Sequence, residues 1–129
     1  MKFEHFALNV PDVHAHVAWY VTNLEFKIAR QLPDPPYMHF LADETGRIII
    51  ELYSNKEFAV HDFAAAHPML FHIAFQTPDA RAVRARLEKA GATPFSENVL
   101  PDGTVLIMMR DPWNVPLQFC QRAKPFPMP

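Results

Sequence analysis

Two short stretches decide the fold of this chain: His5–Asp12, which reads HFALNVPD, and His72–Asp79, which reads HIAFQTPD. They begin 67 residues apart and share His, Ala, Pro and Asp at four of eight positions. The same offset carries Ile50–Tyr53 (IELY) onto Leu117–Cys120 (LQFC), so that two apolar segments each hold one polar residue at the same place. Similarity at a fixed offset indicates a repeated structural unit. The sequence therefore predicts two copies of one module.

Each copy has the pattern of a strand, a helix and three further strands. Asp12 and Asp79 follow a proline and are suited to accept hydrogen bonds from free amides at a helix start. Gly91 is suited to end the second helix. The predicted strands cover residues 2–10, 26–32, 37–42 and 47–53 in the first copy, and 70–77, 93–99, 104–110 and 115–121 in the second. The predicted fold class is α+β, with two βαβββ modules.

We expect a single domain over residues 1–129, with module one at 1–56, a linker at 57–67 and module two at 68–123. Residues 124–129, which include three prolines, are expected to form an irregular tail. Within the linker region, Ser54 and Glu57 have the spacing of a capping box, which predicts a short helix that continues through Ala66.

The amino-acid composition excludes several classes of function and partner. Half of the residues are hydrophobic, 20% are charged and the net charge is −2, which is typical of a soluble globular domain and argues against nucleic acid or a membrane as a partner. The three widely spaced glycines exclude the common glycine-rich phosphate loops, and the two serines lie in no G-x-S-x-G turn. One cysteine excludes an intrachain disulfide. Because the N-terminus has no apolar signal stretch, we expect a cytoplasmic protein.

Four repeat-related polar residues form the candidate metal site: His5, Glu51, His72 and Gln118. A carboxylate inside an apolar strand is costly to bury unless it is paired or metal-bound, so Glu51 is the most informative of them. If the modules are related by pseudo-symmetry, the four side chains converge. Two neutral imidazoles, one carboxylate and one amide oxygen suit a divalent first-row metal ion, for which zinc, nickel, manganese and iron are candidates.

Structural explanations exist for each of these residues alone. A single histidine or Gln118 can be a hydrogen-bonded structural residue, and Glu51 can pair with a buried arginine, for which the candidates are Arg30, Arg47 and Arg110. We expect the other histidines, His14, His16, His61 and His67, to be solvated or to cap helices. For His39 the sequence allows two roles, one lining a cavity and one structural. We take His39, Tyr53 and Trp113 as candidate substrate-pocket residues.

These blocks resemble the vicinal oxygen chelate superfamily, which includes glyoxalase I, extradiol dioxygenases and the fosfomycin- and bleomycin-resistance proteins. HFALNVPD with Trp19 and Tyr20, then IELY, HIAFQTPD and DPWNVPLQF, match its motif blocks over nearly the whole chain. The resemblance implies a cup-shaped mixed sheet with helices on its outer face, and a metal held at the positions of His5, Glu51, His72 and Gln118. It also implies a small-molecule substrate and a homodimer, with modules paired within one chain or swapped between two.

One departure from the family pattern bears on the chemistry, because Gln118 stands where a second carboxylate is usual. A neutral ligand binds a divalent ion less tightly, and an amide cannot act as the base that glyoxalase-type isomerisation needs. That role falls to Glu51, the candidate catalytic residue.

The leading hypothesis is a metal-dependent lyase or isomerase acting on a substrate with two neighbouring oxygens. One alternative is an Fe(II) extradiol-type dioxygenase, since two histidines and a carboxylate also describe that centre. The other is a metal-free drug-binding protein of the bleomycin-resistance type, with Tyr53, Trp113 and Phe119 stacking on the ligand.

Overall fold

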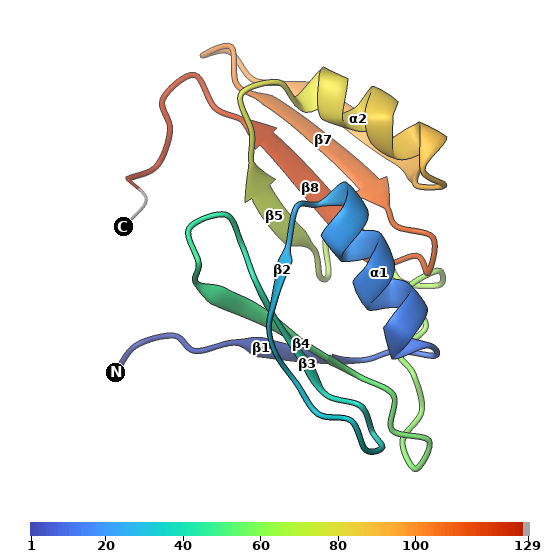
Figure 1. The fold of residues 1–129 in the computed structure, drawn as a ribbon. Helices are drawn as coiled ribbons and strands as arrows, with labels where there is room; N and C mark the ends of the chain where they lie inside the picture. The colour runs from blue at the N-terminus through green and yellow to red at the C-terminus, as the bar shows by residue number, and fades with distance from the viewer. Residues whose placement is uncertain (128–129) are drawn as a thin grey trace. The chain divides into compact units, whose positions relative to one another are not determined.

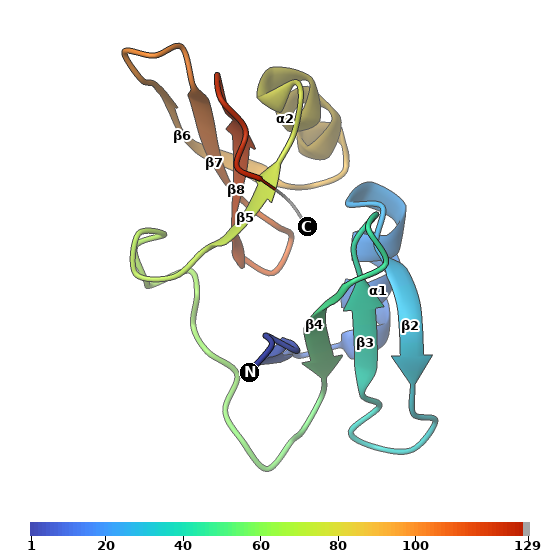
Figure 2. The same ribbon diagram turned by 90° about the vertical axis from the view of Figure 1, so that its left-hand side faces the viewer.

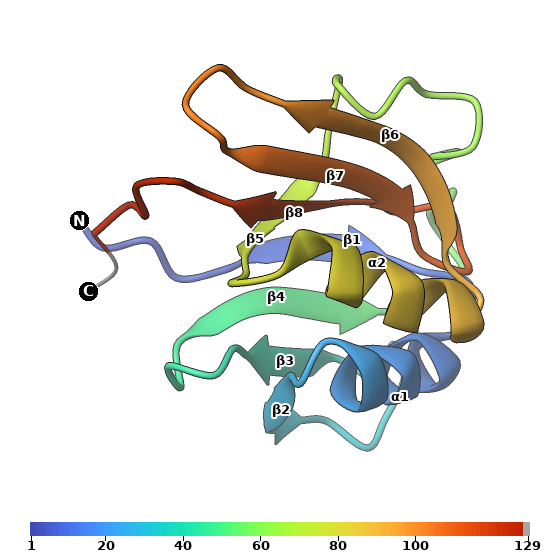
Figure 3. The same ribbon diagram turned by 90° about the horizontal axis from the view of Figure 1, so that it is seen from above.

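Both halves of the chain fold as a strand, a helix and three strands, as the repeat predicts. In the computed structural model, which describes residues 1–127, the chain divides into one unit of residues 1–61 and a second from Asp62 onward. The first unit contains β1 (Phe6–Asn9), α1 (Val13–Asn23), β2 (Lys27–Gln31), β3 (His39–Ala42) and β4 (Ile48–Tyr53) (Figure 1). Its strands lie in the order β1-β4-β3-β2, which can be followed in Figure 3.

The second unit repeats this arrangement. It contains β5 (Ile73–Gln76), α2 (Ala80–Lys89), β6 (Thr93–Val99), β7 (Val105–Arg110) and β8 (Pro116–Gln121). The strand order is β5-β8-β7-β6, and Figure 2 shows these four strands side by side. In each sheet the first and last strands of the module pair in parallel, and the other pairs are antiparallel. The α+β class and the two βαβββ modules are thus confirmed.

Strand register matches between the units at the predicted offset. Ala7 lies opposite Glu51 in the first sheet, and Ala74 lies opposite Gln118 in the second. Both members of the second pair are 67 positions beyond those of the first. The repeat found in the sequence therefore places Glu51 and Gln118 at equivalent sites on equivalent strands.

The helix starts are equivalent as well. The Asp12 carboxylate accepts a hydrogen bond from the Ala15 amide at 3.0 Å, and that of Asp79 accepts one from the Ala82 amide at 2.9 Å. These are the predicted N-caps, which satisfy amides that the first helical turn leaves free.

A second cap in each unit comes from Ser54, directly after β4, and from Gln121, the last residue of β8. The Val13 amide donates to the Ser54 hydroxyl at 2.9 Å, and the Ala80 amide donates to Oε1 of Gln121 at 3.1 Å. Ser54 and Gln121 are also related by the offset of 67. The end of each module thus fastens the start of its own helix.

Each sheet has one face with an apolar, buried centre. In the first unit Leu41, Ile50 and Leu52 are fully buried and share a face by their register. In the second, Ile107, Met109 and Leu117 do the same. Because strand side chains alternate, Glu51 and Gln118 point to the opposite face of their sheets.

The predicted linker helix is wrong. Residues 54–67 form turns and irregular backbone. The Ser54 side chain, which would cap the predicted helix, binds elsewhere. The Ser54 hydroxyl is shared between Val13 and Val10, and the Asn9 amide group donates to the carbonyls of Asn55 and Phe58. These long-range bonds hold the segment in a non-helical path.

Arg110 anchors the next part of the connection, since its guanidinium donates to the carbonyls of Phe63 and Ala66. Residues 124–127 contain no helix or strand, in line with the predicted irregular tail, whose residues 128 and 129 lie outside the described part. Within residues 1–127, neither helix has the length and apolar character needed to cross a membrane.

Candidate functional site

His5 and Glu51 meet in the first unit. His5 directly precedes β1 and Glu51 lies in β4, so parallel pairing of these strands brings the side chains together. His5 Nε2 is 3.1 Å from Glu51 Oε2, and the side chains are only 23% and 12% exposed. His5 Nδ1 is 3.1 Å from Glu4 Oε2. The imidazole therefore lies between two carboxylates.

The partner of Glu51 is thus a histidine and not an arginine. Arg47 lies over the ring of Phe3, Arg110 binds backbone carbonyls, and Arg30 is exposed. Among the explanations for Glu51, pairing with an arginine is therefore wrong.

His72 and Gln118 occupy the equivalent positions in the second unit. His72 directly precedes β5, and its Nδ1 is 3.1 Å from the Pro68 carbonyl oxygen. Because a carbonyl can only accept, this contact places the proton on Nδ1 and leaves Nε2 of the neutral ring with its lone pair free to bind. Metal-binding histidines are commonly oriented by such a bond from the other ring nitrogen.

The Gln118 side chain has a partner on its own strand. Its Oε1 accepts a hydrogen bond from the Cys120 thiol, with a sulfur to oxygen distance of 3.3 Å. Burial raises the pKa of the Cys120 thiol, and the positive charge of Arg122 opposes this effect. Cys120 therefore stays protonated at neutral pH and keeps the hydrogen that it donates.

Each unit thus contributes one pair of the four predicted ligands. Among residues 1–127, no group of three or more His, Cys, Asp or Glu side chains gathers as a metal cluster. The donor chemistry within the first pair nevertheless fits a metal ion. Two ligand atoms that are each about 2.1 Å from one ion lie about 3.0 Å apart at a right angle and about 3.4 Å apart at a tetrahedral angle. The 3.1 Å between His5 Nε2 and Glu51 Oε2 falls within this range.

The candidate substrate-pocket residues lie in different surroundings. Tyr53 is half-buried at the end of β4 and shares the face of Glu51. Trp113 lies in the turn between β7 and β8, where its amide donates to the Asp111 carboxylate. His39 lies opposite Leu52, whereas its neighbour Phe40 lies opposite Glu51. The side chain of His39 therefore points to the face opposite Glu51.

His16 differs from its predicted solvated or capping role, because it is fully buried and packs against the ring of Tyr20. His14, by contrast, is exposed. The prediction treated these two α1 histidines alike, although they are 200° apart around a helix of 3.6 residues per turn.

Sequence reasoning missed Phe40 and Met108. The ring of Phe40 packs edge-on against His5 with centroids 5.4 Å apart, and Met108 lies opposite Gln118. These residues are 68 positions apart, one more than the repeat offset, because the pairing of β3 with β4 shifts register between Leu41 and Ala42, whereas that of β7 with β8 does not. The alternation of side chains within β3 and β7 could have pointed to these two residues, but only if the register of β3 with β4 and of β7 with β8 had been known.

Comparisons with known proteins agree with this architecture. Residues 2–119 match the family model described as the glyoxalase/bleomycin resistance protein/dioxygenase superfamily. A search of curated proteins found no match.

Among solved structures, three illustrate the similarity in fold. A lactoylglutathione lyase from Agrobacterium tumefaciens is 18% identical with a TM-score of 0.65, and the alignment covers 92% of each chain. A glyoxalase family protein from Enterococcus faecalis is 22% identical with a TM-score of 0.71, and 92% of this chain and 96% of that chain are covered. A glyoxalase I variant from Zea mays is 20% identical with a TM-score of 0.75, where 95% of this chain spans 45% of that one. The match of the family model over nearly the whole chain shows that the protein belongs to the glyoxalase/bleomycin resistance protein/dioxygenase superfamily.

Proposed function

We propose that this protein is a metal-dependent lyase or isomerase that acts on a small molecule with two neighbouring oxygen atoms. The observation that supports this most is the contact of His5 Nε2 with Glu51 Oε2 at 3.1 Å, on a sheet face whose repeat-related positions hold His72 and Gln118. The similarity in fold to a protein named lactoylglutathione lyase is consistent with this class of reaction.

In this proposal His5, Glu51, His72 and Gln118 hold a divalent ion of zinc, nickel, manganese or iron. When bound, the ion chelates the two substrate oxygens and stabilises the negative charge that develops on them. His5 and His72 act as neutral ligands, and the Pro68 carbonyl orients the ring of His72. Gln118 adds an oxygen ligand without adding charge.

Glu51 is the proposed catalytic base. Its carboxylate is mostly buried, contacts His5 and lies on the same strand face as the aromatic ring of Tyr53. A carboxylate held there can take a proton from the carbon next to a substrate carbonyl and return it during the isomerisation. Gln118 has no group that can do this.

Metal content tests the proposal. Protein purified without chelator is expected to carry stoichiometric metal, and both Glu51→Ala and His72→Ala are expected to lose it. Glu44→Ala and His61→Ala are matched controls, because both residues are exposed and neither is a proposed ligand. A folded wild-type protein that stays metal-free after reconstitution with each of the four ions would contradict the proposal.

A second function is supported by the same side chains. His5 Nε2 contacts Glu51 Oε2, and Gln118 Oε1 accepts from the Cys120 thiol, so each pair has a contact within the protein itself. This favours a metal-free binding protein as the second candidate, in which the strand face holds a small molecule by shape and stacking. The metal measurement separates the two candidates, and iron together with oxygen uptake on catechols would indicate the dioxygenase reaction instead.

We also propose a homodimer, and mixing variants tests whether the ligands come from one chain or from two. If each site takes His5 and Glu51 from one chain and His72 and Gln118 from the other, a mixed dimer of Glu51→Ala and His72→Ala contains one intact ligand set. Mixing the two metal-free variants then restores metal binding. If each site is built within one chain, the mixture stays metal-free.

A further inference from the structure

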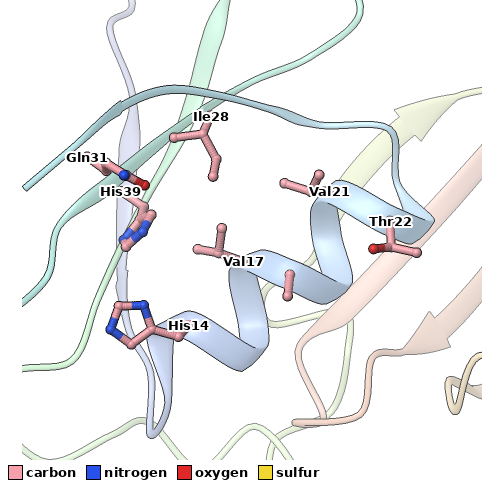
Figure 4. Close-up of a pocket in the computed structure, with 8 residues that line it drawn as sticks. His14, Val17, Val21, Thr22, Ile28, Gln31 and His39 are labelled. Atoms are coloured by element: carbon pink, nitrogen blue, oxygen red, sulfur yellow. The ribbon is translucent and has the colours of Figure 1, made fainter.

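A pocket of about 420 Å³ lies between α1 and the strands β2 and β3, on the helix-covered face of the first sheet. Figure 4 shows an imidazole pair beside Gln31 at one end, Val17 and Ile28 further along, and Val21 with Thr22 at the other end. The lining residues are His14, Val17, Ala18, Val21, Thr22, Ile28, Gln31 and His39. Its volume is in the range of pockets that hold small organic molecules, and a mainly apolar lining with a few polar groups is typical of them.

His39 supplies a hydrogen-bond acceptor at the polar end. The residue is only 5% exposed, and its Nδ1 is 2.6 Å from the Tyr37 carbonyl oxygen. Since the carbonyl must accept, Nδ1 carries the proton and Nε2 of the neutral ring is an acceptor. Within residues 1–127 this Nε2 has no hydrogen-bond partner. Because His39 lines the pocket, this accessible Nε2 can accept a hydrogen bond from a ligand that donates to it.

His14 and Gln31 supply donors next to this acceptor. The ring of His14 lies edge-on to that of His39 with centroids 5.6 Å apart, and Gln31 lies opposite His39 in the strand register. A neutral imidazole and an amide each offer an N–H group. The polar end therefore presents an acceptor and two donors close together.

A neutral hydroxyl group matches this set, because it donates one hydrogen bond and accepts others at the same oxygen. A carboxylate or an ether oxygen cannot donate to His39 Nε2. The apolar end, with Val17, Val21 and Ile28, suits a hydrocarbon body.

From these observations we propose a second ligand site in the first unit, which binds a small apolar molecule that carries a neutral hydroxyl group, such as an alkylphenol. The site is separate from the proposed metal site, since His39 and Glu51 point to opposite faces of the sheet. It does not depend on the proposed function.

Titration of the full chain with 4-ethylphenol, followed by amide NMR, tests this inference. We expect saturable shifts centred on the backbone of α1, β2 and β3. Ethylbenzene, which has no hydroxyl, and 4-ethylanisole, whose oxygen cannot donate, are expected to bind about tenfold more weakly, as the loss of one or two hydrogen bonds implies. Equal affinity for 4-ethylphenol and either control compound, or no saturable binding of 4-ethylphenol, would overturn the proposal.

Two substitutions on exposed positions of α1 check the location. Ala18→Leu fills the pocket and is expected to weaken 4-ethylphenol binding about tenfold, whereas Ala15→Leu places the same side chain outside the pocket and leaves binding unchanged. His14→Phe keeps an aromatic ring but removes the ring nitrogens. We therefore expect it to weaken the binding of 4-ethylphenol several-fold and to leave the binding of ethylbenzene unchanged. If Ala18→Leu and Ala15→Leu bind 4-ethylphenol alike, the site is not where we place it.

Discussion

At the level of single residues, Gln118 distinguishes the two halves of the proposed metal site. It occupies the position in the second sheet that Glu51 occupies in the first, but its oxygen is neutral and accepts a hydrogen bond from Cys120. A carboxylate there adds a negative charge toward a divalent ion. We therefore expect Gln118→Glu to tighten metal binding by at least about tenfold, which is roughly 1.4 kcal/mol.

Competition with a chelator of known affinity measures this change. Asn98→Asp adds the same charge on the exposed strand β6 and serves as the control. If Gln118→Glu binds the ion no more tightly than Asn98→Asp, residue 118 is not a ligand.

Cys120 gives a prediction about pH. Burial raises its pKa in the folded protein, while the unfolded chain has the ordinary value of about 8.5. As pH rises through the ordinary value, the unfolded chain loses the proton first, so the free energy of unfolding falls until the raised folded pKa is passed. Urea unfolding at pH 7 and pH 10 is expected to show a larger loss of stability in the wild type than in Cys120→Ala. Equal losses would mean that this thiol has the same pKa in both states.

Among the secondary-structure elements, the helix caps make the two units directly comparable. Asp12 and Asp79 accept equivalent bonds at 3.0 and 2.9 Å. Asp12→Ala and Asp79→Ala are each expected to lower the free energy of unfolding by about 1 kcal/mol, the usual contribution of such a cap. Denaturant unfolding of both variants measures the change, with the exposed Glu44→Ala as control. A variant as stable as this control would show that its helix does not depend on the cap.

Apart from the linker helix, the type of each helix and strand was predictable, but several ends were not. Predicted strands at residues 2–10 and 70–77 are Phe6–Asn9 and Ile73–Gln76 in the structure, so His5 and His72 both lie just outside their strands. Residue type and alternation continue into these flanks, whereas the ladder of hydrogen bonds extends only as far as the partner strand allows.

At the scale of the whole molecule, the proposed metal site takes ligands from both units. Amide hydrogen exchange can test whether the ion stabilises both units. An ion bound by His5, Glu51, His72 and Gln118 stabilises the folded state by about 2.7 kcal/mol at a free concentration of 100 times its Kd. We therefore expect metal to slow amide exchange in both β4 and β8. Glu51→Ala and His72→Ala are each expected to abolish the effect in both strands. Protection confined to one unit would contradict the four-ligand site.

Because of the repeat, the fold and the equivalence of the candidate ligands could be predicted from the sequence. His5, Glu51, His72 and Gln118 follow one offset, and the strand register keeps that offset because local alternation and caps are the same in both modules. For these two modules the local pattern was enough, because the alternation of apolar residues and the helix caps are encoded by residues close together in the chain.

Only the tertiary structure decided which side chains meet. The direction of His39 depends on its pairing with β4, and the burial of His16 depends on how α1 packs on the sheet. The linker has no helix because Ser54 and Asn55 bond residues more than 40 positions away. Such contacts form between segments distant in sequence, and no local pattern encodes them.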